Sequence, residues 1–159
     1  MISSTHDIQG KLTLQMLDRD GNVLDEQVTH NSITTQGRKL VSDLFKFNIL
    51  TEENQEDKIR RISQIHVGRS KAAFKPDQTG LQDEVGKTPI QSVEYVATGN
   101  ERIQLRMVGE LGMDDANDKL QEAGLFTEDE PPIMYNRVIF DTITKSPEFK
   151  LKLIWEITF

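Results

Sequence analysis

The chain has 159 residues, of which 36% are hydrophobic and none is cysteine, and its formal net charge is -7. This length suits a single domain with its own core. The negative charge argues against sequence-independent binding to nucleic acid or anionic membranes, and the lack of cysteine excludes disulfides and thiolate chemistry. No apolar run is long enough to span a bilayer. Residues 1–7 lack the features of a secretory signal and are expected to be flexible. We therefore expect one globular domain over residues 1–159, made in a cytoplasm.

The N-terminal part of the chain contains the clearest hairpin signal. Residues 8–17 alternate between apolar and polar side chains, and residues 23–29 return as a second strand. Between them lies a turn cluster, residues 18–22, in which Gly21 can adopt a positive φ. The cluster is similar to a calcium loop, but its glycine comes two positions early and no glutamate stands at the twelfth position. The sequence therefore favours a hairpin turn over a calcium site.

After this hairpin the period of the apolar residues changes from two to that of a helix. We expect a helix from about Thr35 to Phe47, with Thr34 or Thr35 as its N-cap. Its apolar side would be formed by Ile33, Leu40, Val41, Leu44 and Phe45. The polar residues 51–58 predict a solvated loop.

The middle of the chain predicts three strands and one long loop. The strands cover residues 60–67, 90–98 and 102–110, and the last two are joined at residues 99–100, Gly-Asn, in a second hairpin. Residues 69–88 contain two glycines and a proline without a clear period, which predicts a long surface loop. Loops of this length in compact domains are commonly functional or mobile.

The C-terminal part predicts a short strand over residues 123–126, inside the stretch 120–126, and a final antiparallel pair, residues 133–143 and 149–159. The last strand alternates almost without a fault, so we expect it to cross the whole domain. The chain ends on Phe159, at a core position of this pattern, so we expect the C-terminus to be packed. Trp155, whose neighbours at two-residue spacing are apolar, is expected to be core rather than a sugar-stacking platform.

About eight strands and one helix predict a mainly β fold. Each alternating strand needs its apolar face covered, so we expect an antiparallel two-sheet β-sandwich, jelly-roll-like, in a single domain. The helix is expected to cap an open end or cover an edge.

The sequence shows no constellation of catalytic or cofactor-binding residues. Residues 80–88 are similar to a phosphate-binding loop, but five residues separate the glycines where the motif needs four, and no helix follows. The three histidines lie singly, and no serine stands in a nucleophile elbow. The acidic residues of 112–119 offer oxygen ligands for a cation, yet a solvated acidic turn is favoured. We expect no enzyme activity, no cofactor and no metal.

Several segments of the chain, taken in order, form an ordered pattern. The pattern begins with the hairpin and with residues 31–38 leading into the helix. It continues through residues 62–68, 76–84, 122–126, 135–140, 143–145 and 153–159. Together these segments resemble the small β-rich structural proteins of phage tails and of phage-derived contractile injection particles. Arg69 and Ser70 depart from it, because another glycine is expected after Gly68. The resemblance implies a role in assembly as part of a virion or phage-like particle, with copies arranged in a ring or trimer at a collar, baseplate or fibre-attachment junction. The resemblance implies no catalytic residues in this chain.

The residues themselves suggest where contacts would lie. Ile154 stands alone among charges on the polar side of the last strand, so it is a candidate contact residue, together with Lys150 and Lys152. Phe74 is a large apolar side chain inside a polar loop, which must tuck under the loop or meet a partner. An alternative is a carbohydrate- or receptor-binding sandwich, with residues 69–88 or 112–119 as its contact surface.

Overall fold

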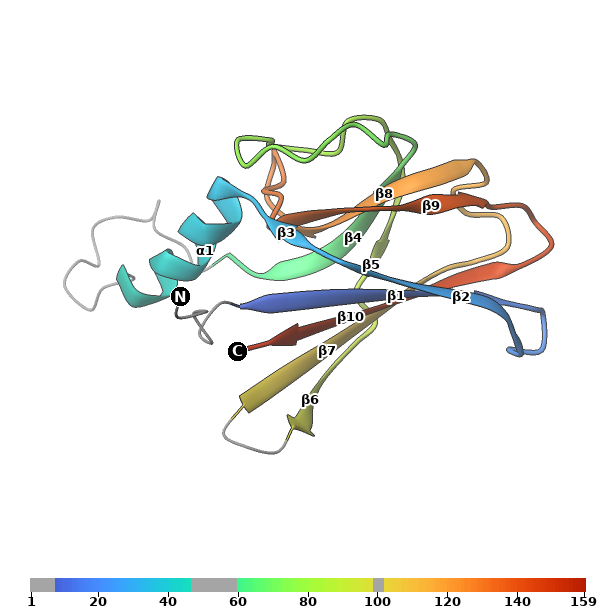
Figure 1. The fold of residues 1–159 in the computed structure, drawn as a ribbon, viewed down its shortest axis with the longest axis horizontal. Coiled ribbons are helices and arrows are strands. Elements are labelled where there is room, and N and C mark those ends of the chain that lie inside the picture. Colours follow the sequence, from blue (N-terminus) through green and yellow to red (C-terminus); the bar gives the residue numbers. More distant parts are fainter. Residues whose placement is uncertain (1–7, 47–59, 99–101) are drawn as a thin grey trace, which may run out of the picture.

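The computed structural model describes residues 8–46, 60–98 and 102–159, and these ranges contain ten strands and one helix (Figure 1). In chain order the elements are β1 (Gln9–Leu17), β2 (Val23–His30), β3 (Ser32–Ile33), α1 (Thr35–Lys46), β4 (Ile62–Gly68), β5 (Glu84–Pro89), β6 (Ser92–Thr98), β7 (Arg102–Leu111), β8 (Lys119–Thr127), β9 (Asn136–Thr144) and β10 (Lys150–Thr158). The strands form two antiparallel sheets, ordered β2-β1-β10-β7-β6 and β3-β9-β8-β4-β5. The predicted mainly β fold with one short helix is confirmed, but it has ten strands where eight were expected.

The two additional strands are short or lack a clear pattern. β3 has only two residues, and β5 lies inside the stretch 69–88 that was predicted as loop. The sequence pattern did not predict β5 because this strand contains Gly86 and Pro89, and both residue types are rare in strands. β5 nevertheless pairs with β4 at the edge of the second sheet, with a register shift after Val67. The predictions for residues 1–7, 51–58 and 99–100 fall outside the described residues.

The last strand, β10, lies in the middle of the first sheet, as its length and alternation predicted. It pairs with β1 over its whole length and with β7 on its other side. Leu151, Leu153 and Trp155 on its inner side have no exposed surface, so Trp155 is a core residue as predicted. Phe159 is 55% exposed, and the prediction that the chain ends in the core is wrong.

The predicted pairing of the last two strands is also wrong. β9 pairs with β8 and β3 in the second sheet, whereas β10 belongs to the first, so the turn between them carries the chain across the core. The alternation of apolar and polar residues in β9 and β10 shows only that each strand buries one of its two sides. Two strands do this equally well when they pair laterally and when they face each other across a core.

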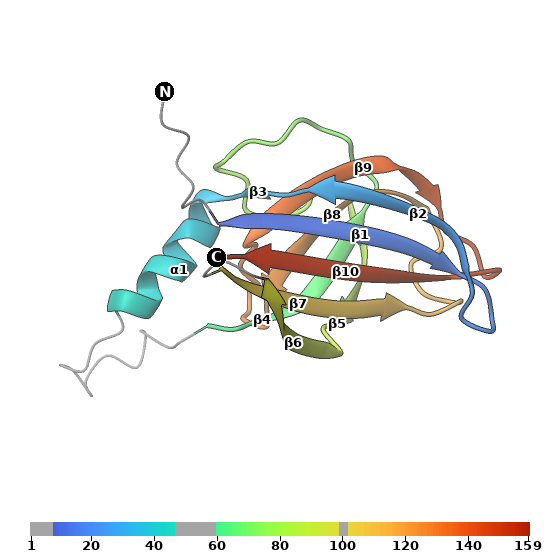
Figure 2. The ribbon, with the colours of Figure 1, turned by 60° about the horizontal axis from the view of Figure 1, so that its bottom comes forward.

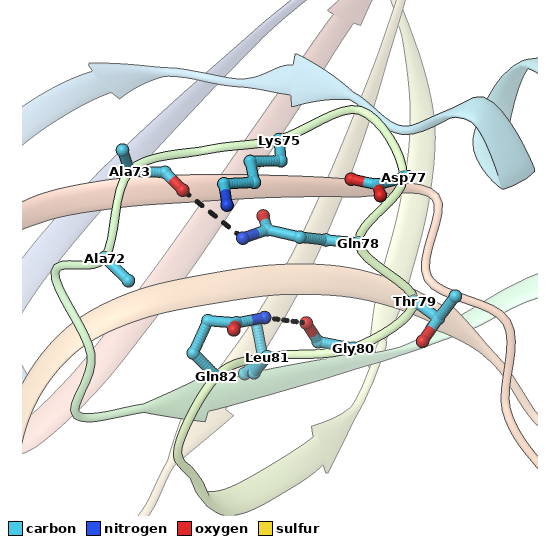
Figure 3. Close-up of a pocket in the computed structure, with 9 residues that line it drawn as sticks. All are labelled: Ala72, Ala73, Lys75, Asp77, Gln78, Thr79, Gly80, Leu81 and Gln82. Atoms are coloured by element: carbon cyan, nitrogen blue, oxygen red, sulfur yellow. Dashed lines mark hydrogen bonds between the residues drawn. The ribbon is translucent and has the colours of Figure 1, made fainter.

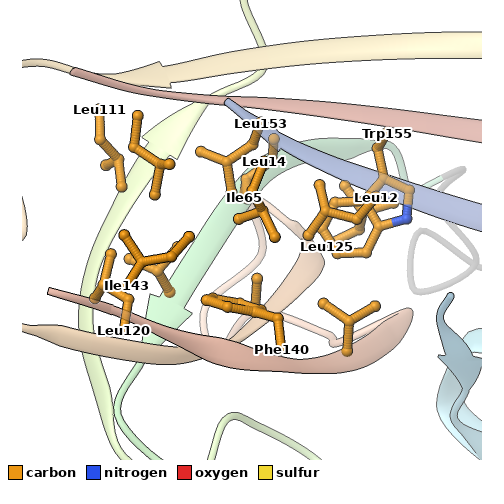
Figure 4. Packing of buried hydrophobic residues seen from close by; sticks show 14 of the residues in the cluster. Leu12, Leu14, Ile65, Leu111, Leu120, Leu125, Phe140, Ile143, Leu153 and Trp155 are labelled. Atoms are coloured by element: carbon orange, nitrogen blue, oxygen red, sulfur yellow. The ribbon is translucent and has the colours of Figure 1, made fainter. Parts of the chain in front are cut away.

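The core is formed by the sides of the two sheets that face each other. Leu12, Leu14 and Leu153 from the first sheet meet Ile65 and Leu125 from the second (Figure 4). At the β2 margin the sheets are also joined by hydrogen bonds. The Gln27 side chain donates to the carbonyl of Asp141 at 2.9 Å, and Thr29 donates to the carbonyl of Ile139 at 3.0 Å. This margin is therefore closed by specific polar contacts.

The turn of the first hairpin has the structure that its residues predicted. Asp18 accepts hydrogen bonds through Oδ1 from the backbone N–H groups of Asp20 and Asn22, at 2.9 and 2.8 Å. Hydrogen bonds from Asn22 hold the pKa of Asp18 below its ordinary value. Gly21 has a φ of 87°, a conformation that glycine adopts without strain.

Helix α1 lies at one end of the two sheets, near the start of β1 (Figure 2). Thr34 is its N-cap, because its Oγ1 accepts from the N–H of Gly37 at 2.9 Å and donates to the carbonyl of Met134 at 2.7 Å. A Cβ at Gly37 would overlap the carbonyl oxygen of Tyr135, so only glycine allows this close approach. The predicted apolar side of the helix is only partly buried, since Leu44 and Phe45 are 57% and 90% exposed.

Candidate functional site

The loop over residues 69–83 is held on the outer side of the second sheet by a buried ion pair. Arg137 on β9 donates through Nε to Oε2 of Glu122 on β8 at 2.8 Å, and both side chains have 0% exposure. The Glu122 carboxylate also accepts from the backbone N–H groups of Gln82 and Asp83, at 3.0 and 2.7 Å. One buried carboxylate thus binds both the opposite charge and the backbone of the loop.

Arg137 fixes the other side of the same loop. Its Nη1 donates to the carbonyl of Ala72 at 2.8 Å, and its Nη2 contacts the carbonyl of Ser70 at 3.4 Å. Arg69 at the loop entrance adds exposed ion pairs with Asp83 and Asp118. The loop is therefore an ordered element with a defined path.

This loop borders an open cavity of about 660 Å³, lined by residues 72–73, 75 and 77–82 (Figure 3). Two side-chain amides are bonded within the loop: Gln78 donates to the carbonyl of Ala73 at 3.3 Å, and Gln82 to the carbonyl of Gly80 at 3.2 Å. Phe74, predicted as a contact residue, is half-buried and does not line the cavity. The cavity lining is accordingly polar and without an aromatic platform.

The acidic loop of residues 112–119 is organised around a lysine. Lys145 is buried, with 2% exposure, and its Nζ donates to the carbonyl of Gly112 at 2.7 Å and to Oδ1 of Asn117 at 3.0 Å, and it contacts the carbonyl of Met113 at 3.3 Å. Burial lowers the pKa of Lys145, while Asp115 and Asp114 oppose that shift. The ammonium group therefore supplies a positive charge and hydrogen bonds to the oxygens of this loop.

His66 on β4 is the one histidine that the structure buries within the described ranges, with 2% exposure. Its ring stacks on Phe126 of β8 with a centroid separation of 3.8 Å. Its Nδ1 is hydrogen-bonded to Glu84 and its Nε2 to Oε1 of Gln64 at 3.1 Å. Burial lowers the pKa of His66, and the Glu84 carboxylate acts in the opposite direction. These contacts give His66 a packing role between β4, β5 and β8.

The outer face of the first sheet carries the candidate contact residue Ile154. It is half-buried and lies between Thr13 of β1 and Val108 of β7; Thr13 in turn lies opposite Val28 of β2, which is 50% exposed. We call these four residues, three of them aliphatic and one a threonine, the apolar row. It runs across four strands of the sheet.

Charged residues border the apolar row on both sides. On one side Glu156 pairs with Lys11 at 3.5 Å and with Arg106 at 3.2 Å, and Arg106 also contacts Glu94 at 3.3 Å. On the other side lie Lys152, half-buried, and Lys150, whose Nζ is 3.9 Å from a carboxylate oxygen of Glu110. The outer face brings Ile154, Lys150 and Lys152 together on β10. Phe74 lies in the loop on the other sheet.

Sequence patterns did not reveal the buried charges Glu122, Arg137 and Lys145. Charged residues normally point to solvent, and only the tertiary structure shows that loops cover these three. The available signal was weak: at two-residue spacing Glu122 stands between Leu120 and Gly124, and Arg137 stands between Tyr135 and Ile139.

Comparison of the chain with protein-family models, curated proteins and solved structures found no match. In the described part of the chain, no helix has the length and apolar character needed to cross a membrane. The same residues contain no group of three or more histidine and acidic side chains placed to hold a metal ion.

Proposed function

We propose that this chain is a non-enzymatic structural component of a phage tail or phage-like contractile injection particle. It acts at a collar, baseplate or fibre-attachment junction through contacts with its own copies and with other particle proteins. The two sheets form a jelly-roll-like sandwich that serves as a rigid block. The protein is made in the host cytoplasm and then incorporated into the particle.

One observation supports this proposal most directly: the apolar row on the outer face of the first sheet. An apolar centre with a charged border is the composition of protein–protein interfaces, in which the border sets orientation and the centre excludes water. The row includes Ile154, and Lys150 and Lys152 stand at its border. The sequence segments that resemble phage-tail structural proteins support the same function.

Size-exclusion chromatography with light scattering tests the proposal, with this chain alone and in mixtures with phage tube, sheath or baseplate proteins. We expect a ring or trimer, or co-assembly with a tail protein. Ile154→Glu places a charge at the centre of the row and should abolish assembly. Lys75→Glu, on the loop of the other sheet, is the matched control and should preserve it. A wild-type chain that stays monomeric and binds none of the tail proteins would contradict the proposal.

A carbohydrate- or receptor-binding function is the second candidate, and the anchored loop with its cavity of about 660 Å³ favours it. A loop that the buried pair of Glu122 and Arg137 already holds in place loses little conformational entropy when it binds a ligand. A glycan array tests this function: Gln78→Ala, inside the cavity, and Phe74→Ala, beside it, should both reduce binding. Ile154→Glu should leave glycan binding unchanged.

A further inference from the structure

The four edge strands of the two sheets differ in how they are protected against pairing with another chain. β3 has only two residues, β5 contains Lys87 and Pro89, and β2 carries Asp25 and Glu26 next to a register shift. Such short lengths, charges, prolines and bulges prevent edge-to-edge association. β6 has seven residues, Ser92–Thr98, and contains no proline, lysine or glycine. Among the described strands, β6 is the edge that remains open to pairing.

β6 lies at the margin of the first sheet (Figures 1 and 2), and it exposes apolar side chains. Val93 and Tyr95 are 58% and 79% exposed, and Ile103 on the neighbouring strand β7 is 56% exposed. The register places Val93 opposite Met107 and Tyr95 opposite Leu105, so these side chains point to the inner side of the sheet. They continue the core surface beyond the area that the second sheet covers.

The register also shows which backbone groups of β6 face outward. The N–H of Phe159 donates to the carbonyl of Ile103 at 2.9 Å, so Ile103 directs its backbone groups towards β10. Hydrogen-bonded residues alternate along an antiparallel strand, and Gln104 and Arg106 therefore face β6, opposite Val96 and Glu94. The remaining residues of β6, at positions 93, 95 and 97, direct their N–H and C=O groups to the free edge.

We propose that two copies of this chain pair through β6 in an antiparallel arrangement, with Tyr95 opposite Tyr95 of the second copy about a two-fold axis. In this register position 93 lies opposite position 97, and every outward backbone group between them finds a partner. Glu94 lies opposite Val96 of the second copy, so no like charges meet directly. A shift of the two-fold centre to position 94 would place two Glu94 carboxylates opposite each other, which is destabilising.

Pairing between β6 and β2 in a head-to-tail ring is less favourable. Successive strands of the first sheet are antiparallel, so β2 and β6 run in the same direction. A ring built by rotation would pair them in parallel, a slightly weaker arrangement, and would bring β6 against Asp25 and Glu26. The two-fold contact avoids both problems and buries Val93 and Tyr95 of both copies. Exposed aromatic side chains of this kind are enriched in interfaces.

This inference goes beyond the proposed function, because the dimer forms whichever particle or ligand the chain serves. The apolar row lies on the outer face, whereas Val93 and Tyr95 point to the inner side. Loss of the β6 contact and loss of assembly through Ile154 are therefore separate results.

A single-cysteine cross-link tests the register, since the chain has no cysteine of its own. Directly opposite residues of a hydrogen-bonded antiparallel pair have Cα atoms about 5.5 Å apart, which is within reach of a disulfide. We expect Tyr95→Cys to form a covalent dimer on oxidation. Leu24→Cys, at a position on edge strand β2 that is 59% exposed and outside the apolar row, is the control and should give little covalent dimer.

Sedimentation equilibrium tests the contact without a cross-link. The wild-type chain should dimerise, and Tyr95→Lys should weaken dimerisation by at least about tenfold, whereas Leu24→Lys on edge strand β2 should not. Tyr95 is exposed, so the variant should keep the wild-type circular dichroism spectrum. A monomeric wild type at about 100 µM would overturn the inference. So would a wild-type dimer that survives Tyr95→Lys while Tyr95→Cys gives no cross-link.

Discussion

Arg137 and Glu122 form an ion pair at 2.8 Å in which neither side chain is exposed to solvent. Both groups use their remaining hydrogen-bonding capacity on the backbone of residues 70–83. A buried pair of charges is stable only when such bonds compensate for the loss of water. The pair therefore links the second sheet to its longest described loop.

Removing one member of this pair should strongly destabilise the protein. We expect Arg137→Met to lower the free energy of unfolding by about 3 to 5 kcal/mol, because the Glu122 carboxylate would remain buried without its partner. Urea unfolding measures this change, and limited proteolysis should show new cleavage in residues 70–83. Lys39→Met, which breaks an exposed ion pair with Asp43, is the control and should cost less than about 1 kcal/mol. Equal effects of the two variants would contradict the structural role of Arg137.

Lys145 should stabilise the acidic loop in place of a metal ion. Lys145→Met leaves the oxygens of Gly112 and Asn117 without a donor, and we expect a loss of about 1 to 3 kcal/mol. The control is Lys119→Met, an exposed lysine at the end of the same loop, which should have little effect. Calcium chloride should not raise the melting temperature of the wild type. A calcium-dependent increase would show that the ammonium group does not fill the site.

His66 should make stability depend on pH. Burial holds the pKa of His66 below its ordinary value, so the unfolded chain binds a proton more readily than the folded one. The folded state is therefore favoured above about pH 6.5, and this contribution is lost as the pH falls through the folded-state pKa. Urea unfolding at pH 7 and pH 5 should show a smaller pH effect in His66→Gln than in the wild type.

An NMR titration of the His66 ring checks the same prediction directly. We expect a pKa below the ordinary histidine value, and a further decrease in Glu84→Gln, because the carboxylate favours the protonated ring. His30→Gln, on the exposed strand β2, is the control for unfolding and should keep the wild-type pH dependence. A His66 pKa above the ordinary value would refute the dominance of burial.

Thr34 should be more important to stability than its neighbour Thr35. Thr34→Val removes the hydroxyl that caps α1 and bonds to Met134, and we expect a loss of about 1 to 2 kcal/mol. Thr35→Val changes an exposed residue at the first helical position and should be nearly neutral. Thermal unfolding of the two variants compares them under identical conditions. Comparable destabilisation by both would mean that the cap contributes nothing specific.

The sequence by itself determined where most elements lie. Period-two alternation located β1, β2 and β10, and the change of period together with Thr34 located α1. These signals are local, because a strand or helix must direct its apolar residues to one side whatever its neighbours are. Local signals of the same kind identified the turn at Gly21.

Only the tertiary structure decided which strands are neighbours and which charges are buried. Alternation shows that β9 and β10 each bury one side, but the choice between lateral pairing and facing across the core depends on the other strands of the two described sheets. The burial of Arg137, Glu122 and Lys145 depends on loops distant in sequence that supply their hydrogen bonds. Each charged group taken alone would be more stable in water than in the core. The hydrogen bonds that stabilise it there come from residues distant in the sequence, so no local sequence pattern reveals its burial.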